Sequence, residues 1–339
     1  MEKFAERVMV WYDANRRPLP WRETRDAYAI WVSEIILQQT RVAQGLDYWR
    51  RFMETFPTVE ALAAADEEQV LLLWQGLGYY SRARNMHAAA RQIVAMGGFP
   101  RTPEGILYLK GVGEYTAAAI GSFAFDLPMV AVDGNVMRVL SRAFGIDEPI
   151  DSTRGRHTLK DLAQMLLPKD DAARFNQAMM EFGALQCVPS RPNCLDCPIA
   201  DMCLALKQGR VDRLPVKEHK TKVRDRWLHY FLITGQRPVG DGVMTTEIYL
   251  HKRTDDDIWH NLYELPLREL PFEQEEEGSF PVRHIRHQLS HQTLHATLYV
   301  NRTDAPLPEK EGFIVVDINH LADYAMPRLM ELLLDGIEL

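Results

Sequence analysis

Apolar residues recur at helical spacing along the first 206 residues of the chain. TRVAQGLDYWRRFMETF from Thr40 and SRARNMHAAARQIVAM from Ser81 show the pattern, with apolar positions three or four residues apart. Ser152 stands directly before another such run, where the side chain of a helix N-cap is found. The spacing therefore predicts an all-α first domain over residues 1–206.

The pattern changes after residue 224. RWLHYFLITG, EIYLHKR, HATLYVN and GFIVVDI are short runs rich in β-branched and aromatic residues, which predict strands, and PRLMELLLDGI predicts a closing helix. Residues 225–339 are thus expected to form a smaller α+β domain. The basic, apolar-poor stretch 207–224 between the two domains has no clear periodicity and is predicted to be an exposed linker.

The length and composition agree with two globular domains. The chain has 339 residues, of which 46% are hydrophobic, and no apolar stretch approaches the roughly 20 residues that span a bilayer. Its N-terminus begins directly in an amphipathic helical pattern, without the features of a secretory or transit signal. We expect an intracellular, cytoplasmic monomer with no membrane role.

The net charge of −8 hides an asymmetry along the chain. Residues 1–224 hold 29 Lys and Arg against 27 Asp and Glu, whereas residues 225–339 hold 10 against 20. The acidic excess therefore belongs to the last third of the chain. A nucleic-acid face on the first domain is permitted, but only local basic patches can supply the attraction to phosphate.

All four cysteines lie within one Pro-rich loop, at Cys187, Cys194, Cys197 and Cys203. Disulfides are disfavoured inside cells, so the spacing C-x6-C-x2-C-x5-C indicates a single metal or cluster site. Structural zinc usually takes its thiolates from two separate C-x2-C pairs, whereas here one loop surrounds the whole site. The spacing favours one [4Fe-4S] cluster and leaves zinc as the alternative. It resembles the cluster loop, residues 187–203 here, of the endonuclease III and MutY families of base-excision glycosylases.

LKGVGEYTAAAIGSFAF contains two glycines just before a strong helical pattern. Gly111 and Gly113 allow a tight turn whose free N–H groups can approach an anion closely. The segment resembles a helix-hairpin-helix turn, although an ordinary connection with glycine C-caps gives the same letters. Asp133 follows between an apolar run and the next helix, which is the arrangement of the helix-hairpin-helix glycosylase superfamily. By itself Asp133 could be only a helix N-cap.

A second carboxyl group of interest lies in PLPWRETRDAYAIWVSEIILQQTRV. Glu34 is surrounded by apolar neighbours, and burial would raise its pKa toward that of a general acid at neutral pH. The alternative is that Glu34 points to solvent, as most glutamates do. Cleaving an N-glycosidic bond needs a proton donor for the leaving base and an ionised carboxylate near the sugar. Glu34 and Asp133 supply one of each.

The first 205 residues resemble a MutY-type adenine DNA glycosylase. The segments that carry the resemblance are LPWR, SEIILQQT, GLGYYSRARN, VDGNVMRV and NQAMMEFGALQC. The resemblance implies that Glu34 is the catalytic acid, Asp133 the sugar-side carboxylate and Asn135 its hydrogen-bonding neighbour. It further implies substrate contacts by Trp21, Arg22, Gln39, Tyr80, Gly111, Gly113, Tyr115 and Gln177. Of these, Arg22 and Gln177 would line the adenine pocket with Trp21 beside it, and Gln39 and Tyr80 would enter the base stack. Taken singly, Trp21 and Tyr80 are equally explained by ordinary core packing.

Tyr115 stands where endonuclease III-like enzymes carry a lysine nucleophile. The resemblance therefore implies a monofunctional glycosylase that flips adenine out of duplex DNA at mispairs with 8-oxoguanine or guanine. Two alternatives remain open at this point. One is an endonuclease III-like bifunctional pyrimidine glycosylase/lyase, and the other is a non-catalytic iron–sulfur DNA-binding protein. Protein partners are unknown.

The same resemblance implies a Nudix-like fold for residues 225–339, which would recognise 8-oxoguanine. HQLSHQTL is similar to the family's lesion-reading segment, with Ser290 as the candidate contact and Leu289 where an aromatic residue is usual. RELPFEQEEEG is the nearest approach to a Nudix metal box, but its spacing fails and Pro271 breaks the helix, so we expect no nucleotide hydrolysis. Four histidines between His284 and His295 raise a metal alternative, which the strand pattern disfavours.

Overall fold

The computed structural model describes residues 2–218, 222–240, 242–270 and 280–337, and it divides into two compact units. The first unit comprises Met1–Ala63 and Ala88–Lys220, and the second comprises Ala64–His87 and Thr221–Leu339. The segment 64–87 thus interrupts the first unit in sequence but packs with the second. Helical spacing continues through this segment, so the sequence pattern does not mark the exchange.

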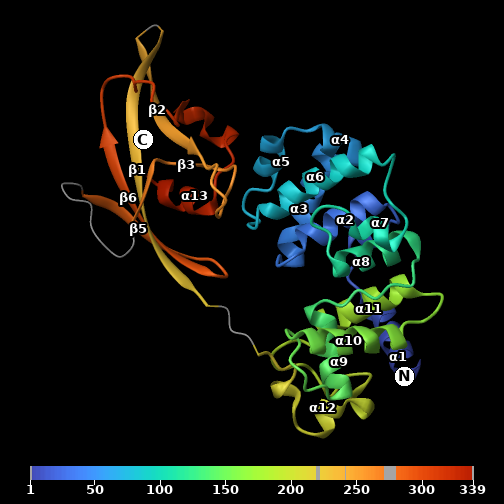
Figure 1. The fold of residues 1–339 in the computed structure, drawn as a ribbon. Coiled ribbons are helices and arrows are strands. Elements are labelled where there is room, and N and C mark those ends of the chain that lie inside the picture. Colours follow the sequence, from blue (N-terminus) through green and yellow to red (C-terminus); the bar gives the residue numbers. More distant parts are fainter. Residues whose placement is uncertain (1, 219–221, 241, 271–279, 338–339) are drawn as a thin grey trace. The chain divides into compact units, whose positions relative to one another are not determined.

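The described part of the first unit is helical, as the apolar spacing predicts (Figure 1). Its α-helices are α1 (Glu2–Asn15), α2 (Ala27–Ile36), α3 (Val42–Thr55), α4 (Val59–Ala64), α7 (Pro103–Leu107), α8 (Glu114–Phe125), α9 (Gly134–Phe144), α10 (Thr153–Leu166), α11 (Ala172–Leu185) and α12 (Leu204–Lys207). Helix α6 (Ser81–Ala95) begins in the second unit and ends in the first. Single turns of 3-10 helix lie at η1 (Pro20–Arg22), η2 (Ala200–Met202) and η3 (Val211–Arg213).

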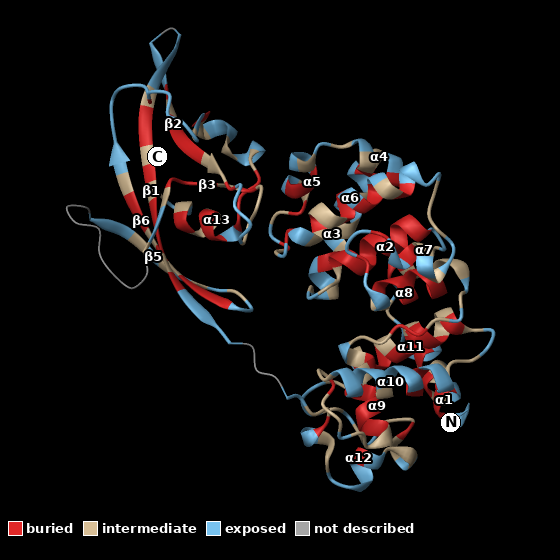
Figure 2. Ribbon diagram, viewed as in Figure 1, coloured by how far each residue is buried: buried red, intermediate tan, exposed pale blue. Residues whose placement is uncertain are grey.

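Helix α2 is buried along its whole length (Figure 2). Asp26 caps its N-terminus, and the Asp26 carboxylate accepts hydrogen bonds from the backbone N–H groups of Tyr28 and Ala29. A helix that is apolar on every side belongs in a core, and Trp31 on α2 is fully buried. Any polar side chain on α2 is therefore held away from bulk water.

A hydrophobic core joins α1, α9, α10 and α11. Helices α9 and α11 approach closely at Gly183, where an added Cβ would lie 2.6 Å from the Cβ and 2.9 Å from the carbonyl oxygen of Asn135. Glycine at this position lets the N-terminus of α9 rest directly on α11. This contact fixes the place where α9 begins, at Asp133.

The second unit contains a mixed sheet covered by a helix (Figure 1). The sheet order is β3-β2-β1-β6-β5, with β4 paired to β1 and β7 paired to β2. Strands β1 and β6 run parallel and the other pairs are antiparallel. The elements are α5 (Glu67–Leu73), β1 (Arg224–Gly240), β2 (Val243–Lys252), β3 (Tyr263–Glu264), β4 (Leu267–Leu270), β5 (Pro281–Gln288), β6 (Gln292–Arg302), β7 (Ile314–Asp317), η4 (Ile318–Asp323) and α13 (Arg328–Leu334).

The core of the second unit lies between the sheet and α13. Leu228, Tyr230 and Leu232 occupy every second position of β1 and therefore share one face of the strand, where they pack in one cluster with Leu329 and Leu333 of α13. In the described residues, a helical unit is followed by a smaller unit built on a mixed sheet, which confirms the predicted fold class. Among the described helices, none has both the length and the apolar character required to cross a membrane.

The segment 64–87 is held in the second unit by polar contacts. The Gln75 side-chain amide donates to Glu331 Oε1 at 2.6 Å, and the Tyr80 hydroxyl donates to the carbonyl oxygen of Met326 at 3.3 Å. Lys252 on β2 pairs with Glu68 on α5 at 2.6 Å. The second unit is therefore built from two pieces of chain far apart in sequence.

Candidate active site

Glu34 lies on the last turn of α2 and is 6% exposed, which excludes the alternative that it points to solvent. The hydroxyl of Tyr115, on the first turn of α8, donates a hydrogen bond to Glu34 Oε2 at 2.7 Å. The two side chains meet because α2 packs against α8 in the first unit. Tyr115 thus bonds to one of the two carboxyl oxygens of Glu34, Oε2, and not to the other, Oε1.

The environment of Glu34 raises its pKa to about 7. Burial is the largest cause, and the negative charge of Asp133 adds to it. The hydrogen bond from Tyr115 and the positive charge of Arg22 oppose the rise. Glu34 can therefore carry a proton at neutral pH and release it over the physiological range, as a general acid must.

Asp133 forms the N-cap of α9, and its two carboxylate oxygens accept different hydrogen bonds. Oδ1 accepts from the backbone N–H of Val136 at 2.7 Å, and Oδ2 accepts from the side-chain amide of Asn135 at 2.7 Å. The Arg138 guanidinium donates in turn to Asn135 Oδ1 at 2.8 Å, which fixes the amide with its NH₂ toward Asp133. Burial raises the pKa of Asp133 above its ordinary value, and the hydrogen bonds from Val136 and Asn135 oppose this rise. These two donors match an ionised carboxylate.

Glu34 and Asp133 open into one cavity of about 590 Å³. Its walls come from η1, α2, α8, α11 and the start of α9. The cavity lining includes eight of the residues singled out from the sequence: Trp21, Arg22, Glu34, Gln39, Tyr115, Asp133, Asn135 and Gln177. The structure thus brings the two carboxyl groups and most of the expected substrate contacts together.

Sequence reasoning missed Glu181, which also lines this cavity. The Glu181 side chain is 1% exposed and accepts five hydrogen bonds, two from the Arg22 guanidinium, two from the Arg17 guanidinium and one from the Arg17 backbone N–H. Burial alone would raise its pKa, but the bonds from Arg17 and Arg22 outweigh it and lower the pKa of Glu181 to about 2. A glutamate on a helix with apolar neighbours, the signal used for Glu34, is also present at Glu181 in AMMEFGAL.

Other expected contacts are held in place by aromatic residues. The Tyr12 hydroxyl donates to Gln177 Oε1 at 2.5 Å, which leaves the Gln177 NH₂ group available as a donor. Trp21 is buried and packs edge-on against Trp49, with ring centroids 5.6 Å apart. Gln39, in contrast, is exposed at the cavity rim with a backbone φ of 55°. Such a conformation is uncommon for a residue other than glycine and is often found at functional sites.

The two hairpin glycines lie between α7 and α8 and are exposed. Gly111 has φ 75°, a conformation that favours glycine, and Gly113 is the N-cap of α8 with open space where a Cβ would lie. The hairpin therefore presents bare backbone at the N-terminus of a twelve-residue helix. Neither glycine lines the cavity of Glu34 and Asp133.

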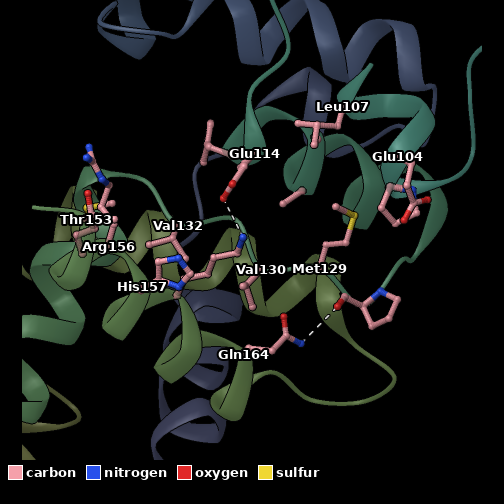
Figure 3. Close-up of a pocket in the computed structure, with 17 residues that line it drawn as sticks. Glu104, Leu107, Glu114, Met129, Val130, Val132, Thr153, Arg156, His157 and Gln164 are labelled. Atoms are coloured by element: carbon pink, nitrogen blue, oxygen red, sulfur yellow. Dashed lines mark hydrogen bonds and ion pairs between the residues drawn. The ribbon is translucent and has the colours of Figure 1, made fainter. Parts of the chain in front are cut away.

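A second cavity in the same unit is larger, about 680 Å³, but lacks this chemistry (Figure 3). It is lined by α7, α8 and α10, and Tyr115 is its one residue in common with the expected site. Glu114 at its edge is already paired with Lys160 at 2.8 Å. The hydrogen bond from Lys160 lowers the pKa of Glu114, which is the opposite of the shift at Glu34. Position and chemistry both favour the cavity of Glu34.

Tyr80 and Ser290 belong to the second unit and line a cavity of about 530 Å³ there, together with Leu289 and Trp259. Tyr80 is buried, with its hydroxyl bonded to Met326, and is therefore not free to enter a base stack. Its neighbour Tyr79 is 43% exposed, with a backbone φ of 46°. Ser290 is exposed beside His291. The structure does not bring Tyr80 or Ser290 into the cavity of Glu34.

The four cysteine side chains line one small cavity next to Arg142 of α9. The Arg142 guanidinium donates to Cys187 Sγ at 3.5 Å and to the carbonyl oxygens of Val188 and Pro189 at 2.8 and 2.9 Å. Burial raises the pKa of Cys194, Cys197 and Cys203, and the positive charge of Arg142 opposes this rise at Cys194 and Cys203. Over the described residues, no three His, Cys, Asp or Glu side chains are gathered tightly enough to hold a metal ion. In chemical type, however, four thiols lining one cavity are the donors that bind an iron–sulfur cluster or zinc.

Comparisons with known proteins agree with this geometry. Residues 32–165 match the model of the HhH-GPD superfamily base excision DNA repair proteins, and residues 243–336 match a NUDIX domain. An adenine DNA glycosylase of Buchnera aphidicola subsp. Baizongia pistaciae is 32% identical over 306 residues, which cover 88% of this chain and 84% of that protein. The chain belongs to the adenine DNA glycosylase family.

Members of this family differ in length. The adenine DNA glycosylase of Rattus norvegicus is 47% identical over 226 residues, which are 62% of this chain but only 44% of the rat protein. That of Buchnera aphidicola subsp. Schizaphis graminum is 29% identical and is covered over 98% of both chains. The chain therefore spans less than half the length of its rat relative and nearly all of a bacterial one.

Solved structures match the helical unit of this adenine DNA glycosylase family member. A thermostable thymine-DNA glycosylase has a TM-score of 0.56 and 29% identity, covering 60% of this chain and 95% of its own. A non-covalent endonuclease III–DNA complex has a TM-score of 0.53 at 23% identity, covering 61% of this chain and 95% of its own, which shows a shared fold alone.

Two expectations for the second unit concern metals. Residues 271–278 of the RELPFEQEEEG stretch lie outside the described residues, so the absence of a working Nudix box stays a prediction. Of the histidines, His295 Nε2 lies 2.8 Å from Asp225 and His284 Nδ1 lies 3.2 Å from Thr297 Oγ1. Both are on strands, β6 and β5, as the pattern predicted.

Proposed function

We propose that this chain is a monofunctional adenine DNA glycosylase acting on duplex DNA, at adenine opposite 8-oxoguanine or guanine. The observation that carries the proposal is the pair of carboxyl groups in one cavity, with the pKa of Glu34 near 7 and Asp133 hydrogen-bonded as a carboxylate. The family membership supports the same activity. The cavity of about 590 Å³ is large enough for one extruded nucleotide.

The reaction begins with proton transfer from Glu34 to N7 of the flipped adenine. Because Tyr115 donates to Oε2, we assign the mobile proton to Oε1. The bond from C1′ to N9 then breaks, and its electron pair leaves with the base. Asp133 stabilises the positive charge that develops on the sugar, and a water molecule adds to C1′ while its proton passes to the Glu34 carboxylate, which restores the acid. The products are free adenine and an abasic site in an unbroken strand.

The other cavity residues hold the base and exclude water. Trp21 supplies an apolar wall, and Arg22 and Gln177 supply fixed polar groups for the adenine edge. Asn135 keeps Asp133 oriented through the bond at 2.7 Å. At the DNA helix, Gln39 is exposed with strained backbone and suits insertion into the base stack. Burial of Tyr80 moves the companion role to Tyr79, which is exposed next to it.

Tyr115 accounts for the absence of strand cleavage in this proposal. A lyase needs an amine that forms a Schiff base with the sugar, and here the corresponding side chain is a phenol bonded to Glu34. Its pKa is raised well above the usual value, first by burial and then by the charge of Glu34. Tyr115 stays protonated and acts as a hydrogen-bond donor to the acid.

DNA would be held outside the cavity by backbone and by a thiolate-bound cluster loop. Gly111 and Gly113 expose N–H groups that can bind a phosphate. The four cysteines would hold one [4Fe-4S] cluster, whose contribution is to fix the fold of loop 187–203. In the second unit, Ser290 is the proposed contact to 8-oxoguanine, in the cavity that it shares with Tyr79.

The test is base release from duplexes that carry adenine opposite 8-oxoguanine, guanine or cytosine. After incubation with the enzyme, alkali converts abasic sites to strand breaks, which are counted on a denaturing gel. We expect breaks at adenine opposite 8-oxoguanine and guanine only. Release of adenine opposite cytosine at the same rate would contradict the mispair preference, and no release from any duplex would contradict the activity.

Two further results separate the alternatives. Strand breaks without alkali, or efficient borohydride trapping of a covalent DNA complex, would favour a bifunctional glycosylase/lyase. For a non-catalytic DNA-binding protein, Glu34→Gln and Asp133→Asn would leave its behaviour unchanged. Under the present proposal both variants lose base release and keep DNA binding.

A further inference from the structure

The cavity contains a charge cluster of which the reaction as described uses only Arg22. Arg17, Arg22 and Glu181 are joined by hydrogen bonds of 2.6 to 3.0 Å, with Glu181 accepting from both guanidinium groups. The Glu181 side chain is 1% exposed and that of Arg22 is 10% exposed. All three residues line the same cavity as Glu34.

The bonding of Glu181 is more extensive than an ordinary ion pair requires. Both of its oxygens bridge the two arginines, and Oε1 also accepts the Arg17 backbone N–H at 3.0 Å. Arg22 is further held by the Arg17 carbonyl oxygen at 3.2 Å and lies over the Tyr12 ring, 5.7 Å from its centroid. Arg22 therefore has one position, set by groups on α1, α11 and the chain before η1.

The charge of this cluster acts on Glu34. A positive guanidinium near a carboxyl group favours its ionised form, and Arg22 lowers the pKa of Glu34. Two arginines with one carboxylate leave a single net positive charge in the cluster. Without Glu181 the cluster would carry two, and Glu34 would lose its proton at lower pH. The charged or titratable groups lining the cavity around Glu34 are Arg17, Arg22, Tyr115, Asp133 and Glu181.

We propose that Glu181 is a positioning residue for the glycosylase reaction, which holds Arg22 in place at the cavity wall and balances its charge so that Glu34 remains protonated at neutral pH. The inference rests on the proposed function, because it assigns Glu181 a part in the acid step. Glu181 itself touches neither base nor sugar in this scheme. It acts through Arg22 and Glu34.

The experiment measures the single-turnover rate of adenine release against pH with the full-length chain. In Glu181→Gln the rate should begin to fall at a pH about half a unit to one unit lower than in the unchanged protein. The double variant Glu181→Gln/Arg22→Gln removes the excess charge, so its midpoint should return to the unchanged value while its maximum rate stays low. Arg22→Gln alone should move the midpoint to higher pH.

Glu264→Gln is the matched control. Glu264 is equally buried and pairs with Arg253 at 2.8 Å, but it lies in the second unit. Its variant should lose thermal stability like Glu181→Gln and keep the midpoint of the pH profile. Glu181→Asp retains the charge and should keep a midpoint close to that of the unchanged protein.

Three results would overturn the inference. The first is a Glu181→Gln enzyme with a lower maximum rate but an unmoved midpoint. The second is a double variant whose midpoint stays as low as in Glu181→Gln. The third applies if Glu181→Gln does not fold: an unmoved midpoint of the pH profile in Arg22→Gln then contradicts the inference. An unchanged protein that releases no adenine would instead contradict the proposed function itself.

Discussion

At the residue scale, Glu34 is both the proposed catalytic acid and a source of instability. Its pKa is raised to about 7 in the folded chain, whereas an exposed glutamate titrates near 4.5. Between these two pH values the unfolded chain loses a proton that the folded chain keeps. Stability therefore falls as pH rises through this window and levels off above pH 7, with a total loss of about 3 kcal/mol.

Glu34→Gln should remove both properties at once. We expect adenine release to fall by roughly 10²- to 10⁴-fold, since a neutral amide cannot donate the proton, while DNA binding is retained. The same variant should melt at a higher temperature than the unchanged protein at pH 8 and at a similar temperature at pH 5. Thermal unfolding at the two pH values measures this, and equal melting temperatures at pH 8 would mean that Glu34 is not a buried acid.

The unchanged enzyme should also show a pH-dependent rate. Under the proposed function, base release needs protonated Glu34, so the single-turnover rate should be highest below pH 7 and fall above it. Asp133 must remain ionised, which sets an acidic limb at lower pH. A rate that does not decline between pH 7 and 9 would remove Glu34 from the role of acid.

At the element scale, the site depends on where α9 meets α11. An alanine at Gly183 would place its Cβ 2.6 Å from the Asn135 Cβ and against Asn135 backbone, neither of which can yield without moving the start of α9. We expect Gly183→Ala to reduce the rate of base release at least about tenfold, through displacement of Asp133 and Asn135. Stability should fall by only about 1 to 3 kcal/mol.

Ala173→Ser on the same helix adds one atom at a half-buried position away from the cavity. It should leave the rate and the melting temperature nearly unchanged. Full activity in Gly183→Ala would show that the close approach of α9 and α11 does not align the carboxylate.

The sequence predicts these helices and the two carboxyl groups, but it does not predict side-chain contacts between residues far apart in the chain. Glu34 on an apolar segment and Asp133 before a helix carry local signals, and both lie where those signals indicate. Glu181 carries the same signal as Glu34, yet its role comes from Arg17 and Arg22, 164 and 159 residues away. Tyr79 and Tyr80 are adjacent, and contacts of Tyr80 distant in sequence, such as the bond of its hydroxyl to Met326, accompany its burial while Tyr79 is exposed. Long-range contacts of this kind leave no trace in local spacing.

At the scale of the whole molecule, the proposed cluster of the cysteine loop can be tested separately from the proposed reaction. We expect the purified chain to contain about four iron atoms and Cys203→Ser to contain far fewer, with weaker binding to duplex DNA. Iron and zinc content, measured together, check this. One zinc per chain and no iron would support the alternative that the spacing left open.

The path of the chain between the two units could not have been expected from apolar spacing. The helical spacing of the flanking segments continues unchanged through residues 64–87. These residues nevertheless pack with a sheet whose first strand begins at Arg224, 137 residues after His87. The division between helical and mixed-sheet units is confirmed. The domain bounds expected from the sequence, 1–206, 207–224 and 225–339, stay a prediction.

This exchange of segment 64–87 gives the molecule unusual tolerance to a break in its covalent chain. Trypsin cleavage after the exposed Lys217 would sever the direct connection between the amino-terminal and carboxyl-terminal fragments. The carboxyl-terminal fragment would still be bound to the amino-terminal one through three polar contacts. These are Glu68 with Lys252, Gln75 with Glu331 and Tyr80 with Met326. The nicked protein should therefore elute from a sizing column as one species and separate into two bands only after denaturation.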